Sequence, residues 1–287
     1  MKRIVLLGAN GQLGTDIRRV FRGEEAELVP LFRSDLDVER TADIAAKLQE
    51  AGRCDVLINC TSYHKTDECE DFAGKAFAVN ALAPQEMARY CRDIGAMFIH
   101  FTTDYVFDGR KRTPYTEDDA TSGLNVYGIS KAAGEQLVCA YGERYFIFRV
   151  SSLFGTAGAS GKGGNFVETM LRVAATGKPL RVVADQMMSP THTLDIAETV
   201  KAFVMNGMAD YGIYHCSGEG ECSWHDFAEE IFRQRGIDAD LSPVSSAEYP
   251  TKAKRPAYSV LDNGKLAAIR PMPRWQDALR DYFRLKD

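Results

Sequence analysis

The sequence lacks the patterns that mark several large classes of protein. No two of its seven cysteines stand in a C-x-x-C spacing, which argues against zinc-ribbon and thioredoxin-type motifs. The apolar run behind the basic N-terminal pair covers only residues 4–7, too short for a secretory signal or a membrane span. An odd number of cysteines without such a signal favours free thiols in a reducing compartment. We therefore expect a cytoplasmic protein with no metal site and no membrane contact.

An excess of positive charge is also missing. Lys and Arg total 35 against 40 Asp and Glu, which gives a formal charge of -5. A mildly acidic chain is a poor candidate for binding nucleic-acid phosphates, so we expect no nucleic-acid partner. The 24 Gly and 10 Pro exclude collagen-like and low-complexity chains, and 45% hydrophobic residues exclude a disordered one. At 287 residues the chain is long enough to bury a large core.

Short apolar runs alternate with helical segments through the first half of the chain. Strands are predicted at residues 3–7, 27–32, 55–59, 97–101 and 145–150, and helices at 15–21, 41–51, 71–94 and 125–141. This alternation indicates βαβ units and an α/β fold, a Rossmann-type doubly wound parallel sheet. Residues 1–150 are accordingly predicted to form a dinucleotide-binding core.

Residues 151–287 are predicted to form mainly a smaller C-terminal substrate-binding lobe, packed on the core, with some segments returning to it. The expected elements are a small-residue loop at 155–164 near a ligand, helices at 166–176, 194–206 and 223–235, and strands at 180–184 and 211–216. Ser223 is the expected N-cap of the last helix, because a serine hydroxyl can accept a backbone hydrogen bond there.

A glycine motif, GANGQLG, occupies residues 8–14 between the first strand and the first helix. Gly8 permits the tight turn, Gly11 lets the backbone approach a pyrophosphate, and Gly14 lets helix and strand pack closely. The N-terminus of the helix then presents free N–H groups to the phosphates. Such turns also occur for structural reasons alone, but the strand and helix around this one favour dinucleotide binding.

The second strand does not end in the acidic residue that usually holds the ribose 2′-OH of NAD. It ends at Arg33 and Ser34 instead. Arg33 favours a 2′-phosphate, and therefore NADPH, although NADH is possible and a solvated arginine is the alternative interpretation. Asp37 is the better candidate for the adenine amino group.

Tyr127 and Lys131 stand four residues apart on a predicted helix, so their side chains share one face. A phenol with a pKa of about 10 is a poor acid–base group at neutral pH, and a neighbouring ammonium lowers that pKa. Taken alone, the pair favours a simple surface contact. Thr103, however, follows the fourth strand at the edge of the sheet where parallel sheets bind ligands, and its hydroxyl can bond a substrate carbonyl.

Together these residues resemble an extended short-chain dehydrogenase/reductase, specifically the dTDP-4-dehydrorhamnose reductase family, nearly end to end. The matching segments are GANGQLG at 8–14, DLDV at 35–38, VNALAPQEMA at 79–88, TTDYVFDG at 102–109, NVYGISKAAGE at 125–135, GNF at 164–166, DQMMSPT at 185–191, GIYHCSGEGECSWHDFA at 212–228 and KRPAYSVLDNGKL at 254–266. The first of these fits the whole superfamily, and the last two are more specific to this branch.

The resemblance implies that Tyr127 donates a proton to the C4 keto oxygen as hydride arrives from the nicotinamide. Lys131 would hold the ribose hydroxyls and tune Tyr127, and Thr103 would position the carbonyl. The expected cofactor contacts are Gly8, Asn10, Gly11, Gln12, Leu13, Gly14, Arg33, Asp37, Val38, Cys60, Ser62, Tyr63 and His64, with Tyr127 and Lys131. The expected substrate contacts are Thr103, Asp104, Tyr105, Ser152, Asn165 and Phe166.

Two departures from the family pattern line the expected sugar site. The family reads R-T-S-W after the fifth strand, where the Trp packs on the deoxysugar, whereas this chain has Ser152 at that position. The segment after the third strand, usually N-A-A-A-[YH]-T, is NCTSYH at 59–64, where His64 is either an extra polar contact or a neutral loop residue. These changes leave the hydride chemistry intact and leave the identity of the sugar open.

The function predicted in this way is NAD(P)H-dependent reduction of the C4 keto group of a nucleotide-linked 6-deoxysugar, foremost dTDP-4-dehydro-L-rhamnose to dTDP-L-rhamnose. The alternatives are another nucleotide-sugar reductase or epimerase, or a non-catalytic NADP-binding regulatory subunit resembling that of methionine adenosyltransferase. The expected partner is the nucleotide sugar, and a homodimer is left open.

Overall fold

A computed structural model describes residues 1–158 and 164–287. The loop expected at 155–164 therefore lies in large part outside the described residues. At the centre is a six-stranded parallel sheet. Its strands, in spatial order, are β10 (Gly212–His215), β5 (Tyr145–Val150), β4 (Met97–Thr103), β3 (Val56–Asn59), β1 (Lys2–Leu7) and β2 (Ala26–Leu31). The strand order reverses between β1 and β3, which is where doubly wound sheets bind their ligands.

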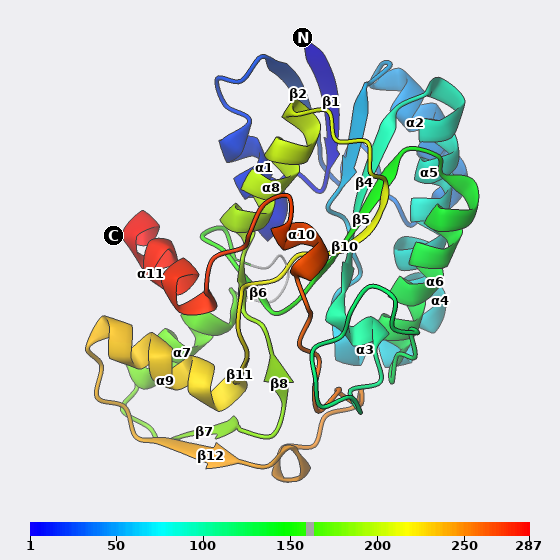
Figure 1. Ribbon diagram of the computed structural model, residues 1–287. Coiled ribbons are helices and arrows are strands. Elements are labelled where there is room, and N and C mark those ends of the chain that lie inside the picture. Colours follow the sequence, from blue (N-terminus) through cyan, green and yellow to red (C-terminus); the bar gives the residue numbers. More distant parts are fainter. Residues whose placement is uncertain (159–163) are drawn as a thin grey trace.

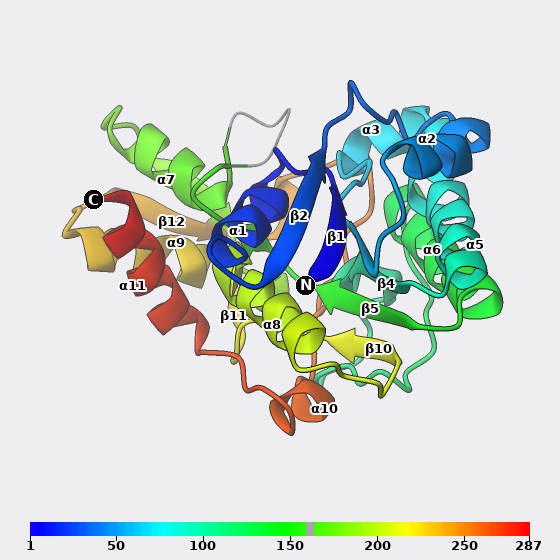
Figure 2. The same ribbon diagram turned by 90° about the horizontal axis from the view of Figure 1, so that it is seen from above.

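Helices cover both faces of this sheet, as expected (Figures 1 and 2). On one face lie α1 (Gln12–Val20) and α8 (Thr193–Met205), and on the other α2 (Ile44–Glu50), α5 (Ala83–Ile94) and α6 (Val126–Tyr141). Strand β1 shows why both faces need covering: Ile4 and Leu6 point into one hydrophobic core, Val5 and Leu7 into the other, and all four are buried. A strand that is apolar on both sides is the mark of a parallel sheet between helices.

The helix predicted at 71–94 is confirmed for residues 73–94, with two differences: Phe72 breaks the chain before it, and a π-helical segment lies within it. The observed elements are α3 (Thr66–Asp71), α4 (Ala73–Phe77), a π-helical segment, η2 (Ala78–Leu82), and then α5. Phe72 leaves the helical region at φ -121° and ψ 50°. Pro84, in the first turn of α5, has no N–H to donate four residues back and its ring crowds the carbonyl of Asn80. The π turn accommodates that proline, and such turns are frequent near functional sites.

The C-terminal lobe is built from paired short strands and three helices. Its strand pairs are β7 (Leu180–Val183) with β12 (Leu241–Val244), β8 (Met187–Met188) with β11 (Cys222–Ser223), and β6 (Leu153–Phe154) with β9 (Thr191–His192). Its helices are α7 (Phe166–Ala174), α9 (Trp224–Arg235) and α11 (Trp275–Lys286). Ser223 caps α9 with a full capping box, which confirms the predicted N-cap. Strand β10 and α8 return from this half of the chain to the core (Figure 1).

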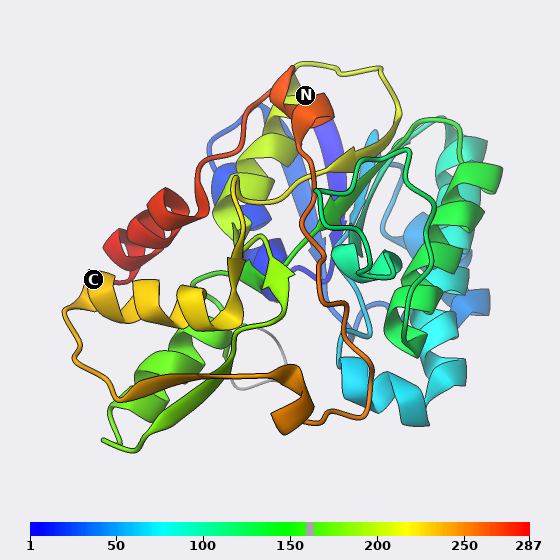
Figure 3. The ribbon, with the colours of Figure 1, turned by 60° about the horizontal axis from the view of Figure 1, so that its bottom comes forward.

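The remaining short elements are η1 (Thr41–Asp43), η3 (Asp104–Val106), η4 (Ser246–Glu248) and α10 (Gly264–Ala267). Between η4 and α10, a segment at 251–262, here called the strap, runs back from the lobe across the core (Figure 3). Arg255 of the strap forms an ion pair of 3.0 Å with Asp67 of α3. The strap therefore ties the lobe to the helices that follow β3.

None of the helices in the described residues is both long and apolar enough to cross a membrane.

Candidate active site

A cavity of about 460 Å³ runs along the carboxyl edge of the sheet. Its walls come from the loop between β1 and α1, from the ends of β2, β3 and β4, from α6, and from the first residue of α9. The predicted residues that line it are Gly8, Asn10, Gly11, Gln12, Leu13, Arg33, Asp37, Val38, Cys60, Ser62, Tyr63, His64, Thr103, Asp104, Tyr105, Tyr127, Lys131 and Ser152. One cavity thus brings together residues that lie far apart in the sequence.

Gly8 and Gly14 of the glycine loop leave no room for a side chain at their own positions. Gly8 has φ +72°, and a Cβ built on it would lie 3.0 Å from the backbone carbon of Cys60. A Cβ on Gly14 would lie 2.2 Å from the carbonyl oxygen of Gly8. Helix α1 begins behind Gly11, which offers its first turn no side-chain cap. The first N–H groups of α1 therefore face the cavity as a cradle that fits a pyrophosphate.

Replacing Gly14 with Ala tests this close approach. We expect Gly14→Ala to lower the free energy of unfolding by about 1–3 kcal/mol, because the methyl group forces the loop away from α1. The variant should also bind NADPH more weakly, which titration calorimetry and thermal melts can measure. Gly74→Ala in α4 is the matched control, because a Cβ there meets nothing within 4 Å. Equal effects of the two variants on NADPH binding would contradict the assignment of the loop.

Charged side chains surround the part of the cavity next to the end of β2. Arg33 lies 3.2 Å from the carboxylate of Asp37 and 3.6 Å from that of Glu39, and its side chain is 71% exposed. Lys75 of α4 lies 3.0 Å from Glu39. Glu39 and Lys75 also line the cavity. Sequence reasoning missed both of them, because only the fold brings α4 beside the end of β2.

Asn80, in the π-helical segment, holds the loop that follows β3 in place. Its Oδ1 accepts hydrogen bonds from the Tyr63 backbone N–H at 2.9 Å and from the Ser62 hydroxyl at 3.3 Å. Its Nδ2 donates to Ser130 of α6 at 3.0 Å. Sequence reasoning also missed this residue, whose only signal was its place in the family-like segment 79–88. Asn80 therefore links the predicted cofactor contacts Ser62 and Tyr63 to the helix that carries Tyr127.

Helix α6 presents both Tyr127 and Lys131 to the cavity. Asn125 caps it by accepting a hydrogen bond from the Gly128 N–H at 2.8 Å. The Nζ of Lys131 donates to the Phe101 carbonyl at 2.6 Å. Burial lowers the pKa of Lys131 to about 8, and the nearby Glu135 partly opposes that shift.

Burial raises the pKa of Tyr127 above its ordinary value, although hydrogen bonds from Thr103 and Ser62 work in the opposite direction. The expectation that Lys131 lowers this pKa together with a bound nicotinamide stays a prediction, because burial has the largest effect on Tyr127 in the structure without the cofactor. The Lys131 ammonium donates a hydrogen bond to the Phe101 carbonyl. Burial of the Tyr127 phenol is the largest influence on its pKa. A phenol that stays protonated is suited to donate a proton.

Asp104 is a buried carboxyl group that gathers three hydroxyls. Thr103 Oγ1 donates to its Oδ1 at 2.9 Å, while Ser151 and Ser259 donate to its Oδ2 at 3.0 and 2.5 Å. Burial raises the pKa of Asp104 to about 6, against the effect of these three hydrogen bonds. Thr103 also accepts the Tyr105 N–H at 3.2 Å. Ser151 and Ser259 come from the end of β5 and from the strap, so the full arrangement depends on three parts of the chain.

The C-terminal lobe contributes one aromatic ring to the cavity wall. Trp224, the first residue of α9, contributes to its wall, and its ring lies 4.8 Å from that of Phe166. Ser152 has φ +46°, in the left-handed region that few residues other than glycine adopt. Sequence reasoning noted the missing aromatic ring at position 152 but did not place Trp224 at the site.

Three predicted contacts lie behind the cavity wall instead of in it. Gly14 packs against the glycine loop, and Phe166 supports Trp224. Asn165 caps α7 and donates to the Gly155 carbonyl at 2.9 Å. Direct contact of these three residues with a bound molecule stays a prediction.

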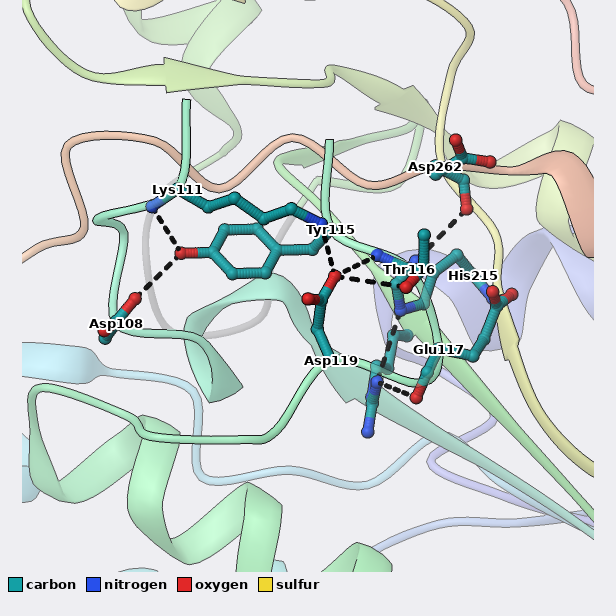
Figure 4. Close-up of polar contacts among 9 residues, drawn as sticks. Asp108, Lys111, Tyr115, Thr116, Glu117, Asp119, His215 and Asp262 are labelled. Carbon is teal, nitrogen blue, oxygen red and sulfur yellow. Dashed lines mark hydrogen bonds and ion pairs between the residues drawn. The ribbon is translucent and has the colours of Figure 1, made fainter. Parts of the chain in front are cut away.

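A polar network anchors the sheet edge next to the cavity (Figure 4). Glu117 accepts the backbone N–H of His215 at 2.8 Å, and the His215 ring lies 3.2 Å from the Asp262 carbonyl. Arg149, just before Ser151 in the chain, forms a buried ion pair of 2.7 Å with Glu135. Burial and the Arg149 charge lower the pKa of His215 to about 3, so the ring is neutral. The network fixes the end of β5, from which Ser151 and Ser152 follow.

All seven cysteines fall within the described segments and none is paired in a disulfide. Across residues 1–158 and 164–287, no group of three or more His, Cys, Asp or Glu side chains is arranged to hold a metal ion.

Comparisons with known proteins show the family to which the chain belongs. Residues 1–286 match the model of the RmlD substrate binding domain. A crystal structure of a dTDP-4-dehydrorhamnose reductase from Clostridium acetobutylicum has 37% sequence identity and a TM-score of 0.92, with 99% of both chains covered. A reductase of the same name from Bacillus anthracis, solved in complex with NADP, has 34% identity, a TM-score of 0.92 and 99% coverage of both chains. The spore coat polysaccharide biosynthesis protein SpsK of Bacillus subtilis is 37% identical over 287 residues, 99% of this chain and 97% of that protein. The resemblance inferred from the motifs is thereby confirmed, and the chain belongs to the RmlD family, that of the dTDP-4-dehydrorhamnose reductases.

Proposed function

We propose that this protein uses NADPH to reduce the C4 keto group of a nucleotide-linked 6-deoxysugar, dTDP-4-dehydro-L-rhamnose, to the alcohol. One observation carries the proposal: a single cavity connects the glycine loop at one end to Tyr127, Lys131 and Thr103 further along. A pyrophosphate cradle without an acid–base group indicates binding alone, whereas the two together in one cavity indicate chemistry on a second, bound molecule.

The residues present fit NADPH along its whole length. Gly8 and Gly14 let the loop, the end of β3 and the start of α1 pack closely, which leaves the first N–H groups of α1 open to a pyrophosphate. Arg33 and Lys75, which pair with Asp37 and Glu39, are the basic side chains near the end of β2. The cofactor supplies a hydride when it is bound. In this proposal Lys131 bonds the ribose hydroxyls, and Tyr127 gives its proton to the keto oxygen; both side chains line the same cavity.

The experiment is a reduction assay on the purified full chain with NADPH and dTDP-4-dehydro-L-rhamnose. We expect NADPH oxidation matched one for one by dTDP-L-rhamnose, identified by chromatography and NMR. Turnover only with a different keto sugar would keep the reductase and replace the substrate. Tight NADPH binding without turnover of any keto sugar nucleotide would contradict the proposal and favour a regulatory subunit.

Arg33 sets the preference for the phosphorylated cofactor in this proposal. Its guanidinium makes charge-assisted contacts to a 2′-phosphate that NADH lacks. We expect Arg33→Ala to raise KM for NADPH about tenfold and to leave KM for NADH unchanged; the modest size reflects the exposure of Arg33. Added salt should shrink the wild-type preference. Arg110→Ala is the control, because Arg110 is an exposed arginine outside the cavity wall. An Arg33→Ala variant that keeps the wild-type ratio of KM for NADPH to KM for NADH would contradict this role.

Trp224 provides the aromatic wall for the sugar nucleotide. We expect Trp224→Ala to raise KM for the sugar substrate about tenfold or more, because burying a large apolar side chain contributes roughly 1.5–3 kcal/mol, and to leave KM for NADPH unchanged. The chain has two tryptophans, and the other one, Trp275, is 4% exposed and does not line the cavity. A change in tryptophan fluorescence on substrate binding therefore reports on Trp224, and we expect quenching. Trp224→Phe should retain most of the affinity. Quenching that persists in Trp224→Phe would remove this residue from the site.

A further inference from the structure

Two neighbouring residues of strand β4 are held by two side chains of helix α6. The Lys131 Nζ donates to the Phe101 carbonyl at 2.6 Å, and the Thr102 hydroxyl donates to the Glu135 carboxylate at 2.5 Å. All four residues are buried. Because Lys131 and Glu135 are four residues apart in a helix, they lie one turn apart on the same face. The helix is therefore attached to β4 at two points, directly before Thr103.

A third element holds Glu135 from another direction. Arg149, on β5, donates from Nη2 to one oxygen of the carboxylate at 2.7 Å and from Nε to the other at 3.0 Å. A two-pronged contact of this kind restricts both the position and the orientation of a carboxylate. Arg149 is itself held, since its Nη1 lies 3.3 Å from the Nε2 of His215. Glu135 therefore joins α6 to both β4 and β5.

Stability alone is a weak reason for such an arrangement. The attraction within a buried ion pair is largely offset by the lost hydration of the two charges, and apolar side chains of similar volume often stabilise a core as well. What the pair fixes is geometry, because the carboxylate of Glu135 must lie where both Thr102 and Arg149 reach it. Tyr127 is roughly two turns before Glu135 on the same helix. A slide or tilt of α6 at Glu135 would therefore move the Tyr127 phenol relative to β4.

We propose that Glu135 is a positioning residue for the reduction, which holds α6 on β4 so that the Tyr127 phenol and the Thr103 hydroxyl face the same keto oxygen. The inference rests on the proposed reductase function and deepens it. Thr102, Lys131 and Tyr127 line the cavity, whereas Glu135 lies behind its wall and acts through them. Such positioning matters because a misplacement of about 1 Å can slow a reaction about a hundredfold.

The test removes the Thr102 hydroxyl and keeps the size and branching of the side chain. In Thr102→Val we expect the single-turnover rate of NADPH oxidation with dTDP-4-dehydro-L-rhamnose to fall about tenfold or more, because α6 loses one of its two attachments to β4. The affinity for NADPH and KM for the sugar nucleotide should stay close to those of the wild type. Thr102→Ser keeps the hydroxyl donor and should restore most of the rate.

Thr199→Val is the matched control for the loss of a buried hydroxyl. Thr199 is also buried, but its hydroxyl donates to the Asp195 carbonyl at 2.9 Å, within α8 on the other face of the sheet. This variant should retain the wild-type rate. A loss of rate in Thr102→Val that Thr199→Val shares, or that Thr102→Ser does not restore, would be a general effect of packing and would overturn the proposal.

Glu135→Gln tests the carboxylate itself. The amide has a similar size, but it offers the Arg149 donors one acceptor oxygen in place of two. We expect a larger loss of rate than in Thr102→Val, together with a lower melting temperature, because a buried charge is left without its partner. Adding Arg149→Met removes that charge and should raise the melting temperature again while the rate stays low. A rate that recovers along with the melting temperature would mean that Glu135 contributes stability alone, against the proposal.

Fluorine NMR of protein made with fluorotyrosine follows the Tyr127 ring without turnover. Its resonance is identified as the one that Tyr127→Phe lacks. We expect one sharp line in the wild type and in Thr102→Ser, and a shifted or broadened line in Thr102→Val. Either an unchanged line or a wild-type rate in Thr102→Val would overturn the positioning role alone. A wild type that oxidises no NADPH with any keto sugar nucleotide would overturn the proposed function and this role with it.

Discussion

Tyr127→Phe is expected to lose about a hundred- to ten-thousandfold in kcat, the range in which a positioned general acid contributes. The lost hydroxyl is the proposed proton donor, whereas the ring still packs edge-on against Tyr105, with 6.2 Å between ring centres. NADPH binding should therefore stay close to that of the wild type. Single-turnover kinetics with dTDP-4-dehydro-L-rhamnose and calorimetry with NADPH separate the two effects.

Tyr141→Phe serves as the matched control, because Tyr141 lies on the same helix, outside the cavity wall. It should retain the wild-type rate. A Tyr127→Phe variant that turns over at nearly the wild-type rate would remove Tyr127 from the mechanism and would leave the cavity without its proton donor.

Lys131→Met is expected to weaken NADPH binding by roughly ten- to a hundredfold, because hydrogen bonds to a charged group contribute about 1.5–3 kcal/mol. The wild-type kcat/KM should also fall as pH rises through about 8, the value to which burial lowers the pKa of Lys131. The sign follows from the chemistry: above this pH the amine loses its charge, and with it the attraction for the ribose oxygens. The variant should lack that step.

Lys201→Met is the control for the loss of a lysine, since Lys201 lies on α8 on the other face of the sheet and pairs with Glu198. Its NADPH affinity and pH profile should match the wild type. If Lys131→Met keeps the pH step near 8, that step belongs to another group and Lys131 has no part in setting it.

Much of the fold was accessible from sequence because its signals are local. The six strands of the sheet, the glycine loop and the cap at Ser223 follow from apolar runs, from glycine at set spacings and from one capping residue. The spacing of Tyr127 and Lys131 likewise places both on one face of a helix without any knowledge of tertiary structure. The helix expected at 71–94 is observed from residue 73 onward, and its π-helical segment also has a local signal, Pro84, whose missing N–H removes one α-helical hydrogen bond.

What the sequence alone determined is thus the fold class, the family, the nucleotide end of the cavity and the Tyr127–Lys131 pair. The tertiary structure decided what surrounds that pair. Contacts such as Ser259 with Asp104 span 155 residues, and no periodicity or spacing encodes them. The same holds for Trp224, which α9 carries to the cavity, and for the raised pKa of Tyr127. A pKa depends on how much water the packed chain excludes, and a sequence pattern cannot report that before the fold exists.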